Sequence, residues 1–186
     1  MKRLLSVMLV VFVLSGCRSS SDEIDRVVAL RTALQNKGGC SFNANITVDY
    51  GDSFTAFALS CKCDDQQNMD VTVLGPDTIS GITYRISGGK GKLTFDDTAV
   101  GFEMIADDQI TPVCAPWLIM KALKSGYISA TSNETDGLLV RLDDSFFGTA
   151  FSVDIWLGDN DLPKYAEVIW QGKRIVSMHI SDFEIL

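Results

Sequence analysis

The stretch that decides the fold is Cys40-Ser41-Phe42-Asn43-Ala44-Asn45-Ile46-Thr47-Val48-Asp49. Apolar and polar side chains alternate along it, which is the period of a β-strand with one buried face and one face in water. A second run of strand-forming residues follows over 54–63, after a turn around Tyr50-Gly51. The two runs therefore predict an antiparallel β-hairpin.

The same alternation recurs along most of the chain, separated by turn signals rich in Gly, Pro and Asp. Two segments have a helical pattern instead. In the first, Ser20 and Glu23 have the spacing of a capping box and the pattern stops at Gly38-Gly39; the second runs from Trp117 to Gly126. The further strand patterns lie at 71–73, 82–86, 93–95, 138–142, 151–157 and on both sides of Gly172-Lys173.

This order, a helix, about five strands, a helix and about five strands, sets the fold class. Each alternating strand has one apolar face to cover, and two helices are too few to cover both sides of a large sheet. We therefore predict a mainly β (α+β) fold, a curved, unclosed antiparallel β-barrel with an N-terminal helix and a second short helix as its lid.

Composition restricts the class of protein. The chain has 186 residues, of which 46% are hydrophobic, enough for one globular core and little more. Its formal net charge of −8 argues against nucleic acid as a partner, because binding to phosphates requires clustered Lys and Arg.

The N-terminus has the pattern of a signal for export. Lys2 and Arg3 precede an apolar run over 4–14 that is interrupted only by Ser6 and is too short to span a bilayer. The next residues, Leu14-Ser15-Gly16-Cys17, resemble a bacterial lipobox, which implies a diacylglyceryl group on Cys17 and cleavage just before it. A secreted protein with an incidental Cys, or a short membrane anchor, is the less favoured alternative.

The expected organisation follows from that resemblance. Residues 1–16 are a lipoprotein signal peptide, 17–21 are the lipidated Cys and a tether, and 22–186 are the folded domain. The expected location is extracytoplasmic, with Cys17 anchored in the cell membrane. Removal of residues 1–16 leaves 14 basic and 24 acidic residues, so a purely electrostatic attachment to anionic lipid is not expected.

The order of elements also resembles the LolA/LolB-type lipoprotein fold. The segments that carry the resemblance are the lipobox, Val73-Leu74-Gly75-Pro76, Ile79-Ser80-Gly81-Ile82, Gly89-Lys90-Gly91-Lys92-Leu93-Thr94-Phe95 and the helix after Pro116. This group includes lipoprotein carriers, mycobacterial lipid-binding lipoproteins and GerS-type germination lipoproteins. The resemblance implies an unclosed barrel with a helical lid over about residues 22–186.

Catalytic and metal-binding motifs are not apparent. The single His179 lies in an alternating run with Ser177 and Ser181, without a nucleophile motif or a second His for zinc. Asp159-Asn160-Asp161 resembles the start of a calcium loop but lacks the Gly and the Glu that complete one. We therefore expect no enzyme, no cofactor and no metal.

Four cysteines remain in the mature chain: Cys40, Cys61, Cys63 and Cys114. If Tyr50-Gly51 is a two-residue turn, Cys40 lies opposite Cys61, whereas a slip of two residues places it opposite Cys63. We predict a disulfide from Cys40 to Cys61 or Cys63, with Cys114 as a candidate partner for the remaining thiol. A four-thiolate zinc site is less favoured, because Cys-x-Cys on a strand is not a zinc-knuckle spacing.

Two non-enzymatic functions remain open. In the first, the concave sheet binds an apolar ligand, a lipid or acyl chain, and in the second the anchored domain is a scaffold that recruits a cell-envelope protein, as the GerS resemblance implies. Exposed Trp156 and Trp170 are the candidate partner surface. The candidate cavity residues are Phe42, Phe57, Leu59, Tyr84, Phe95, Trp117, Phe151 and Ile155.

Overall fold

The structure, a computed structural model, describes residues 19–49, 54–95, 98–103, 105–106, 109–146 and 148–186. The expected signal peptide and Cys17 lie outside these residues. Helix α2 (Ser19–Asn36) opens the described chain. Residues 19–21 were expected to form part of a tether, but they are helical, since α2 begins at Ser19.

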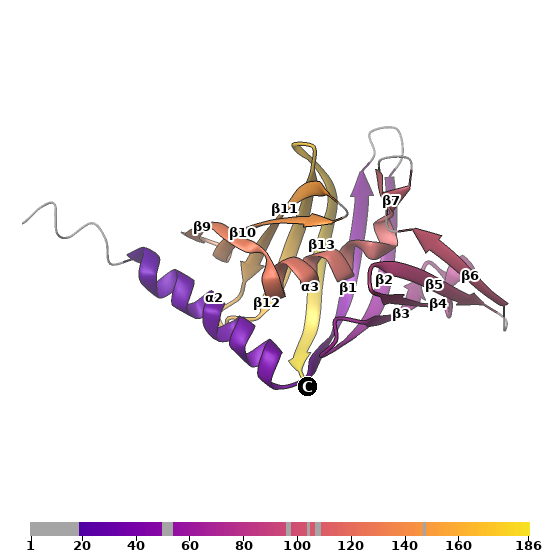
Figure 1. Cartoon of the computed structure of the whole chain (residues 1–186), viewed down its shortest axis with the longest axis horizontal. Coiled ribbons are helices and arrows are strands. Elements are labelled where there is room, and N and C mark those ends of the chain that lie inside the picture. Colours follow the sequence, from indigo (N-terminus) through magenta and orange to yellow (C-terminus); the bar gives the residue numbers. More distant parts are fainter. Residues whose placement is uncertain (1–18, 50–53, 96–97, 104, 107–108, 147) are drawn as a thin grey trace, which may run out of the picture.

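The strands before the second helix follow the hairpin pattern, and Figure 1 shows them on one side of the molecule. They are β1 (Gly39–Asp49), β2 (Phe54–Asp64), β3 (Met69–Gly75), β4 (Thr83–Ser87), β5 (Lys90–Phe95) and β6 (Thr98–Glu103), with a short 3-10 helix η1 (Asp77–Ile79) before β4. A small separate hairpin of β7 (Ile105–Ala106) and β8 (Gln109–Ile110) follows.

Helix α3 (Ala115–Ser125) follows the 3-10 helix η2 (Pro112–Cys114), and Pro116 stands in its first turn, where a missing N–H costs nothing. Five strands complete the chain. They are β9 (Tyr127–Glu134), β10 (Gly137–Phe146), β11 (Thr149–Leu157), β12 (Pro163–Trp170) and β13 (Lys173–Ile185).

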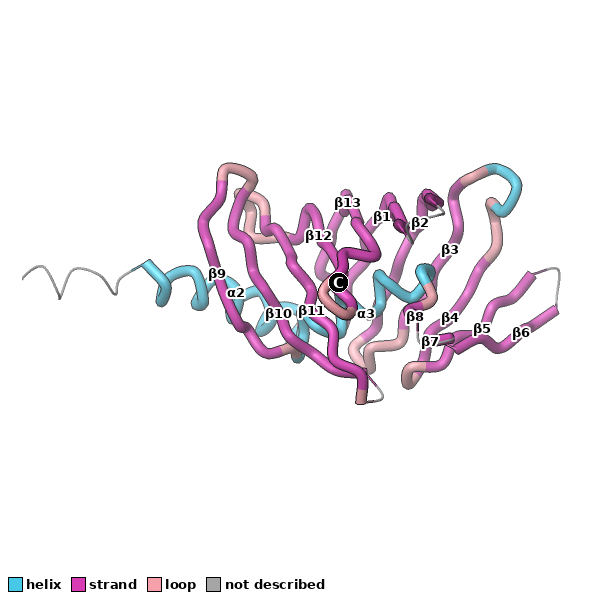
Figure 2. Tube along the Cα trace, turned by 90° about the horizontal axis from the view of Figure 1, so that it is seen from above, coloured by secondary structure: helices cyan, strands magenta, loops and turns pink. Residues whose placement is uncertain are grey.

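Eleven strands form one antiparallel sheet, in the order β6-β5-β4-β3-β2-β1-β13-β12-β11-β10-β9. Pairing of β1 with the last strand, β13, joins the two halves of the chain into this single layer. Figure 2 shows the layer strongly bent, with edge strands β6 and β9 far apart. The predicted fold class, a curved, unclosed antiparallel barrel with two helices, is confirmed.

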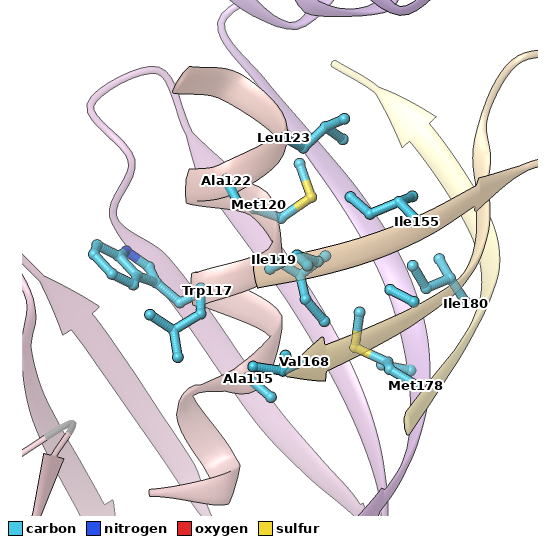
Figure 3. Close-up of a cluster of buried hydrophobic side chains, with 14 of the residues drawn as sticks. Ala115, Trp117, Ile119, Met120, Ala122, Leu123, Ile155, Val168, Met178 and Ile180 are labelled. Atoms are coloured by element: carbon cyan, nitrogen blue, oxygen red, sulfur yellow. The ribbon is translucent and has the colours of Figure 1, made fainter. Parts of the chain in front are cut away.

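Helix α3 lies across the concave side of the sheet and is almost entirely buried. Figure 3 shows Ile119, Met120 and Leu123 directed toward strands of the C-terminal half, whereas Trp117 points the other way. The indole Nε1 of Trp117 donates to the carbonyl of Gln67, 2.7 Å away in the turn between β2 and β3. The Lys121 ammonium bonds Asp144 on β10 at 2.6 Å. The lid helix is therefore fixed to both wings of the sheet, one formed by β2–β6 and the other by β9–β12.

Helix α2 is tied to the lid and to the edge of the sheet. Arg31 donates from Nε to the carbonyl of Leu123 at 2.7 Å and from Nη2 to that of Gly126 at 2.6 Å, at the C-terminal end of α3. The carboxylate of Glu23, which is 7% exposed, accepts bonds from Thr131 and Asn133 on β9. Glu23 therefore accepts hydrogen bonds from the edge strand β9, in place of the capping-box role expected from the sequence.

Candidate functional site

The candidate cavity residues belong to the core between the sheet and α3. Phe42, Leu59, Tyr84, Trp117, Phe151 and Ile155 are each at most 5% exposed, and Phe57 is half-buried against them. Phe95 belongs to β5, but its side chain lies outside what the structure describes. Most of the predicted lining is therefore packed core, as expected for a face covered by α3.

Burial decreases across the β2–β6 wing toward its free edge. Cross-strand pairing places Cys61, Val71, Tyr84, Leu93 and Val100 in one row, so their side chains share the concave face. The first three are 1%, 2% and 3% exposed, Leu93 is partly buried, and Val100 is 56% exposed. The concave face is thus apolar to its edge but is covered only in its inner part.

The position of α3 explains this gradient. The main contacts of the helix with the sheet are to β10 and β12, on the opposite wing. On the β4–β6 side the Tyr84 hydroxyl donates to the carbonyl of Val113, in η2 just before the lid helix, at 2.7 Å. Several apolar side chains of η2 and of the segment from η1 to β6 are only partly buried: Ile79, Ile82, Leu93, Phe102 and Val113.

The four cysteines are all buried, and the structure contains them as free thiols. Of the two registers left open by the sequence, the slipped one is correct: Cys40 lies opposite Cys63, and Phe42 lies opposite Cys61. The assumption of a two-residue turn at Tyr50-Gly51 was therefore wrong, because Asp49 pairs with Phe54 and the two paired strands are four residues apart in sequence. Cys114 lies apart from this pair in sequence, at the N-cap of α3.

A buried lysine stands beside the cysteine pair. The Nζ of Lys124, a residue 7% exposed, lies 3.7 Å from the Cys63 sulfur and 3.1 Å from the carbonyl oxygen of Asp64. The hydrogen bond from Cys40, aided by the charge and N–H of Lys124, lowers the pKa of Cys63 to about 7 despite burial. The same hydrogen bond and burial raise the pKa of Cys40.

The two predicted surface tryptophans have different environments. Trp170 is 5% exposed, so its assignment to the partner surface was wrong. Trp170 pairs with the inward-facing Phe151 and therefore lies on the concave side. It shares that face of β12 with the buried Ala166 and Val168, four and two residues before it. Trp156 is half-buried on the convex side, where its Nε1 donates to Glu134 at 2.9 Å.

Trp156 forms part of an open pocket on the convex face. The pocket has a volume of about 550 Å³, and its lining combines aromatic rings with charged side chains. The solvated His179 predicted from the sequence is exposed and lies here, with its ring centroid 4.7 Å from that of Tyr165. The lining residues are Glu134, Asp136, Trp156, Lys164, Tyr165, Glu167 and His179.

No group of three or more His, Cys, Asp or Glu side chains in the part of the chain that the structure describes is placed to hold a metal ion. None of the helices described is both long and apolar enough to cross a bilayer.

No protein-family profile and no curated protein matches the sequence. Similar solved structures include a LolA superfamily protein from Nitrosomonas europaea, 10% identical over 86% of this chain and 93% of that chain, with a TM-score of 0.47. LprF from Mycobacterium bovis is 10% identical over 89% of this chain and 96% of that chain, with a TM-score of 0.43. The lipoprotein LppX from Mycobacterium tuberculosis is 12% identical over 86% of this chain and 94% of that chain, with a TM-score of 0.38.

These similarities are of architecture, at low identity.

Proposed function

We propose that the protein is a non-enzymatic, membrane-anchored lipoprotein that binds an apolar ligand, a lipid or an acyl chain, on the concave face of its sheet. The observation that carries the proposal is the gradient from buried Tyr84 to exposed Val100 along one apolar row. An apolar surface that continues past the edge of its lid gains free energy when a ligand covers it, at about 25 cal/mol per Å².

The ligand would lie between the β4–β6 wing and the N-terminal end of α3. Leu93, Phe102 and Val113 supply partly buried apolar surface there. Few polar contacts are needed, because apolar ligands are held mainly by shape and burial. Anchoring through Cys17 would keep this site outside the cytoplasm and close to a membrane, the source of such ligands.

Native mass spectrometry of the full chain carrying Cys17→Ser, purified from the cells that make it, tests the binding. We expect a bound lipid, or uptake of an added fatty acid. Val100→Asp should reduce the occupancy about tenfold, because burying a carboxylate beside an acyl chain costs more than 1.4 kcal/mol. Ala99→Asp is the matched control, since Ala99 pairs with Thr94 on the other face of the same strand. A chain that neither carries nor takes up lipid would contradict the proposal.

Anchoring is tested separately. The wild-type chain should incorporate labelled fatty acid and sediment with membranes, whereas Cys17→Ser should do neither, because two acyl chains are needed for durable attachment. Membrane attachment that survives this substitution would contradict the lipid anchor without bearing on the apolar site.

Export would also determine whether the cysteines are oxidised or reduced. In an oxidising compartment the opposed thiols of Cys40 and Cys63 would form the disulfide predicted from the sequence, because directly opposed residues lie within bridging distance.

A further inference from the structure

The convex pocket is built on three rings that neighbour one another across three strands. Trp156 on β11 pairs with Tyr165 on β12, which pairs with His179 on β13. The ring centroids of Trp156 and Tyr165 are 5.2 Å apart, and those of Tyr165 and His179 are 4.7 Å apart. Cross-strand contacts fix these rings as a continuous aromatic floor.

Carboxylates surround this floor. Glu134 ends β9 and accepts the Trp156 indole bond through Oε2. Asp136 follows in the turn to β10 and lines the same pocket. Glu167 accepts bonds through Oε1 from the Tyr165 hydroxyl at 2.8 Å and from Arg174 at 2.9 Å.

The charges do not cancel within the pocket. Three carboxylates face one ammonium, that of Lys164, and only Glu167 has a cation, Arg174, within ion-pair distance. The bond to Glu167 and its charge raise the pKa of Arg174. Glu134 and Asp136 are exposed and carry the negative charge that a ligand would meet.

We propose that this pocket binds a lysine or arginine side chain from a basic segment of a partner protein. The negative face of an aromatic ring attracts a cation within about 6 Å of its centroid, and adjacent carboxylates accept its N–H groups. A volume of about 550 Å³ is enough for such a side chain with the backbone that carries it. The net charge of the whole chain, −8, would also steer a basic partner toward it.

This proposal is independent of the apolar ligand, because the pocket lies on the opposite face of the sheet from Tyr84 and Val100. It gives the alternative function, recruitment of a protein partner, a specific place and chemistry. Trp156 is the one predicted contact residue that lies there, and Glu134 and Asp136 were not predicted from the sequence.

NMR titration of the indole N–H of Trp156 tests the proposal, because its Nε1 bonds the carboxylate that a cation would engage. The probe is the acetylated and amidated tetrapeptide Lys-Arg-Lys-Arg, with tetraglutamine as its uncharged counterpart. We expect a saturable shift of the Trp156 signal with the basic peptide only. The signals of Trp117 and Trp170, each 5% exposed, should not move.

Variants separate the site from general electrostatics. Glu134→Gln should weaken peptide binding about fivefold and Trp156→Leu about tenfold, which corresponds to roughly 1 to 1.4 kcal/mol for one charge contact or one cation–π contact. Glu184→Gln removes one negative charge from an exposed position on β13 outside the pocket, and should change the affinity less than twofold.

Three results would overturn the proposal. The first is no shift of the Trp156 signal with the basic peptide. The second is an equal loss of affinity in Glu134→Gln and Glu184→Gln, which would indicate non-specific attraction. The third is a shift with N-acetylglucosamine oligomers that Glu134→Gln leaves unchanged, which would identify a sugar site instead.

Discussion

At the scale of residues, a buried ammonium and a second thiol, those of Lys124 and Cys40, both stabilise the thiolate of Cys63. Its pKa of about 7 lies below the ordinary value of 9.0 for an unfolded cysteine. An acid whose pKa is lower in the folded state stabilises that state above the unfolded pKa, and this stabilisation is lost as the pH falls through the folded pKa.

We therefore expect the reduced protein to gain stability between about pH 7 and pH 9, by about 2 kcal/mol from Cys63. Urea unfolding at several pH values in the presence of a reductant measures this gain. Cys63→Ser should abolish it, because the hydroxyl still accepts from Lys124 but does not ionise. Cys114→Ser should keep it, since burial raises the pKa of Cys114 to about 12. If Cys63→Ser gained as much stability between pH 7 and pH 9 as the parent, ionisation of Cys63 would not be the cause of the gain.

Oxidation should join Cys40 to Cys63 and leave Cys61 and Cys114 free. Alkylation without reduction, followed by peptide mass mapping, should find two modified thiols in the oxidised protein and one linked pair. Closing the loop between residues 40 and 63 should stabilise the oxidised form by about 3 kcal/mol over the reduced form. A bridge from Cys40 to Cys61 would require the rejected register and would contradict the β1–β2 pairing.

Single residues also show where reasoning from the sequence fails. The burial of Phe42, Tyr84 and Ile155 was predictable, because each follows the parity of an alternating strand. Trp170 was misplaced because β12 is apolar on both of its faces near this end, where Ile169 and Trp170 are adjacent. The choice between Cys61 and Cys63 depended on a turn whose length the hydrophobic pattern does not specify.

At the scale of elements, the side chain of Arg31 on α2 caps the C-terminal end of α3. Arg31 donates to the carbonyl of Leu123, in the last turn of α3, where an α-helix leaves carbonyls without intrahelical partners, and to the carbonyl of the C-cap residue Gly126. A cation at this end also interacts favourably with the helix dipole.

Arg31→Met should therefore lower the free energy of unfolding by about 2 to 3 kcal/mol, the range for charged hydrogen bonds left unmade. Urea unfolding at neutral pH measures the change. Arg26→Met on the same helix is the control: its ion pair with Asp161 is partly exposed on both sides and should contribute less than about 1 kcal/mol. Equal losses in the two variants would contradict the capping role of Arg31.

The elements missed in the sequence include the two edge strands of the main sheet, as well as the short β7–β8 hairpin. Both β6 and β9 have mostly exposed side chains, so neither has the apolar alternation by which the other strands were predicted. An edge strand pairs on one side only and requires little buried surface. The convex pocket was missed for a related reason, because Glu134 and Asp136 lie at the end of the undetected strand β9.

At the scale of the whole molecule, an unclosed sheet requires contacts that hold its two wings at a fixed separation. One such contact lies at the turn between β4 and β5, where Gly89 packs against the ring of Phe146 at the end of β10. The same ring lies 5.4 Å, between centroids, from Trp117 on the lid helix, in an edge-on arrangement. The wings and the lid therefore meet at one aromatic side chain.

The neighbouring glycines of this turn allow a matched test. Gly88 and Gly89 both have positive φ, at 55° and 77°, as a two-residue hairpin turn requires. A side-chain carbon on Gly88 would meet no atom within 4 Å, whereas one on Gly89 would overlap the Phe146 ring. Gly88→Ala should cost about 1 to 2 kcal/mol of backbone strain. Gly89→Ala should cost a further 1 to 3 kcal/mol for the overlap.

A double-mutant cycle with Phe146→Ala assigns this difference to the contact between the wings. In the Phe146→Ala background the cost of Gly89→Ala should fall to that of Gly88→Ala, a coupling of about 1 to 3 kcal/mol, because the overlapping ring is gone. The cost of Gly88→Ala should be the same in both backgrounds. Urea unfolding of the five variants and the parent measures every term. If the Gly89 and Phe146 substitutions were additive, the wings would not touch at this turn, and the separation of the wings would depend on the lid helix alone.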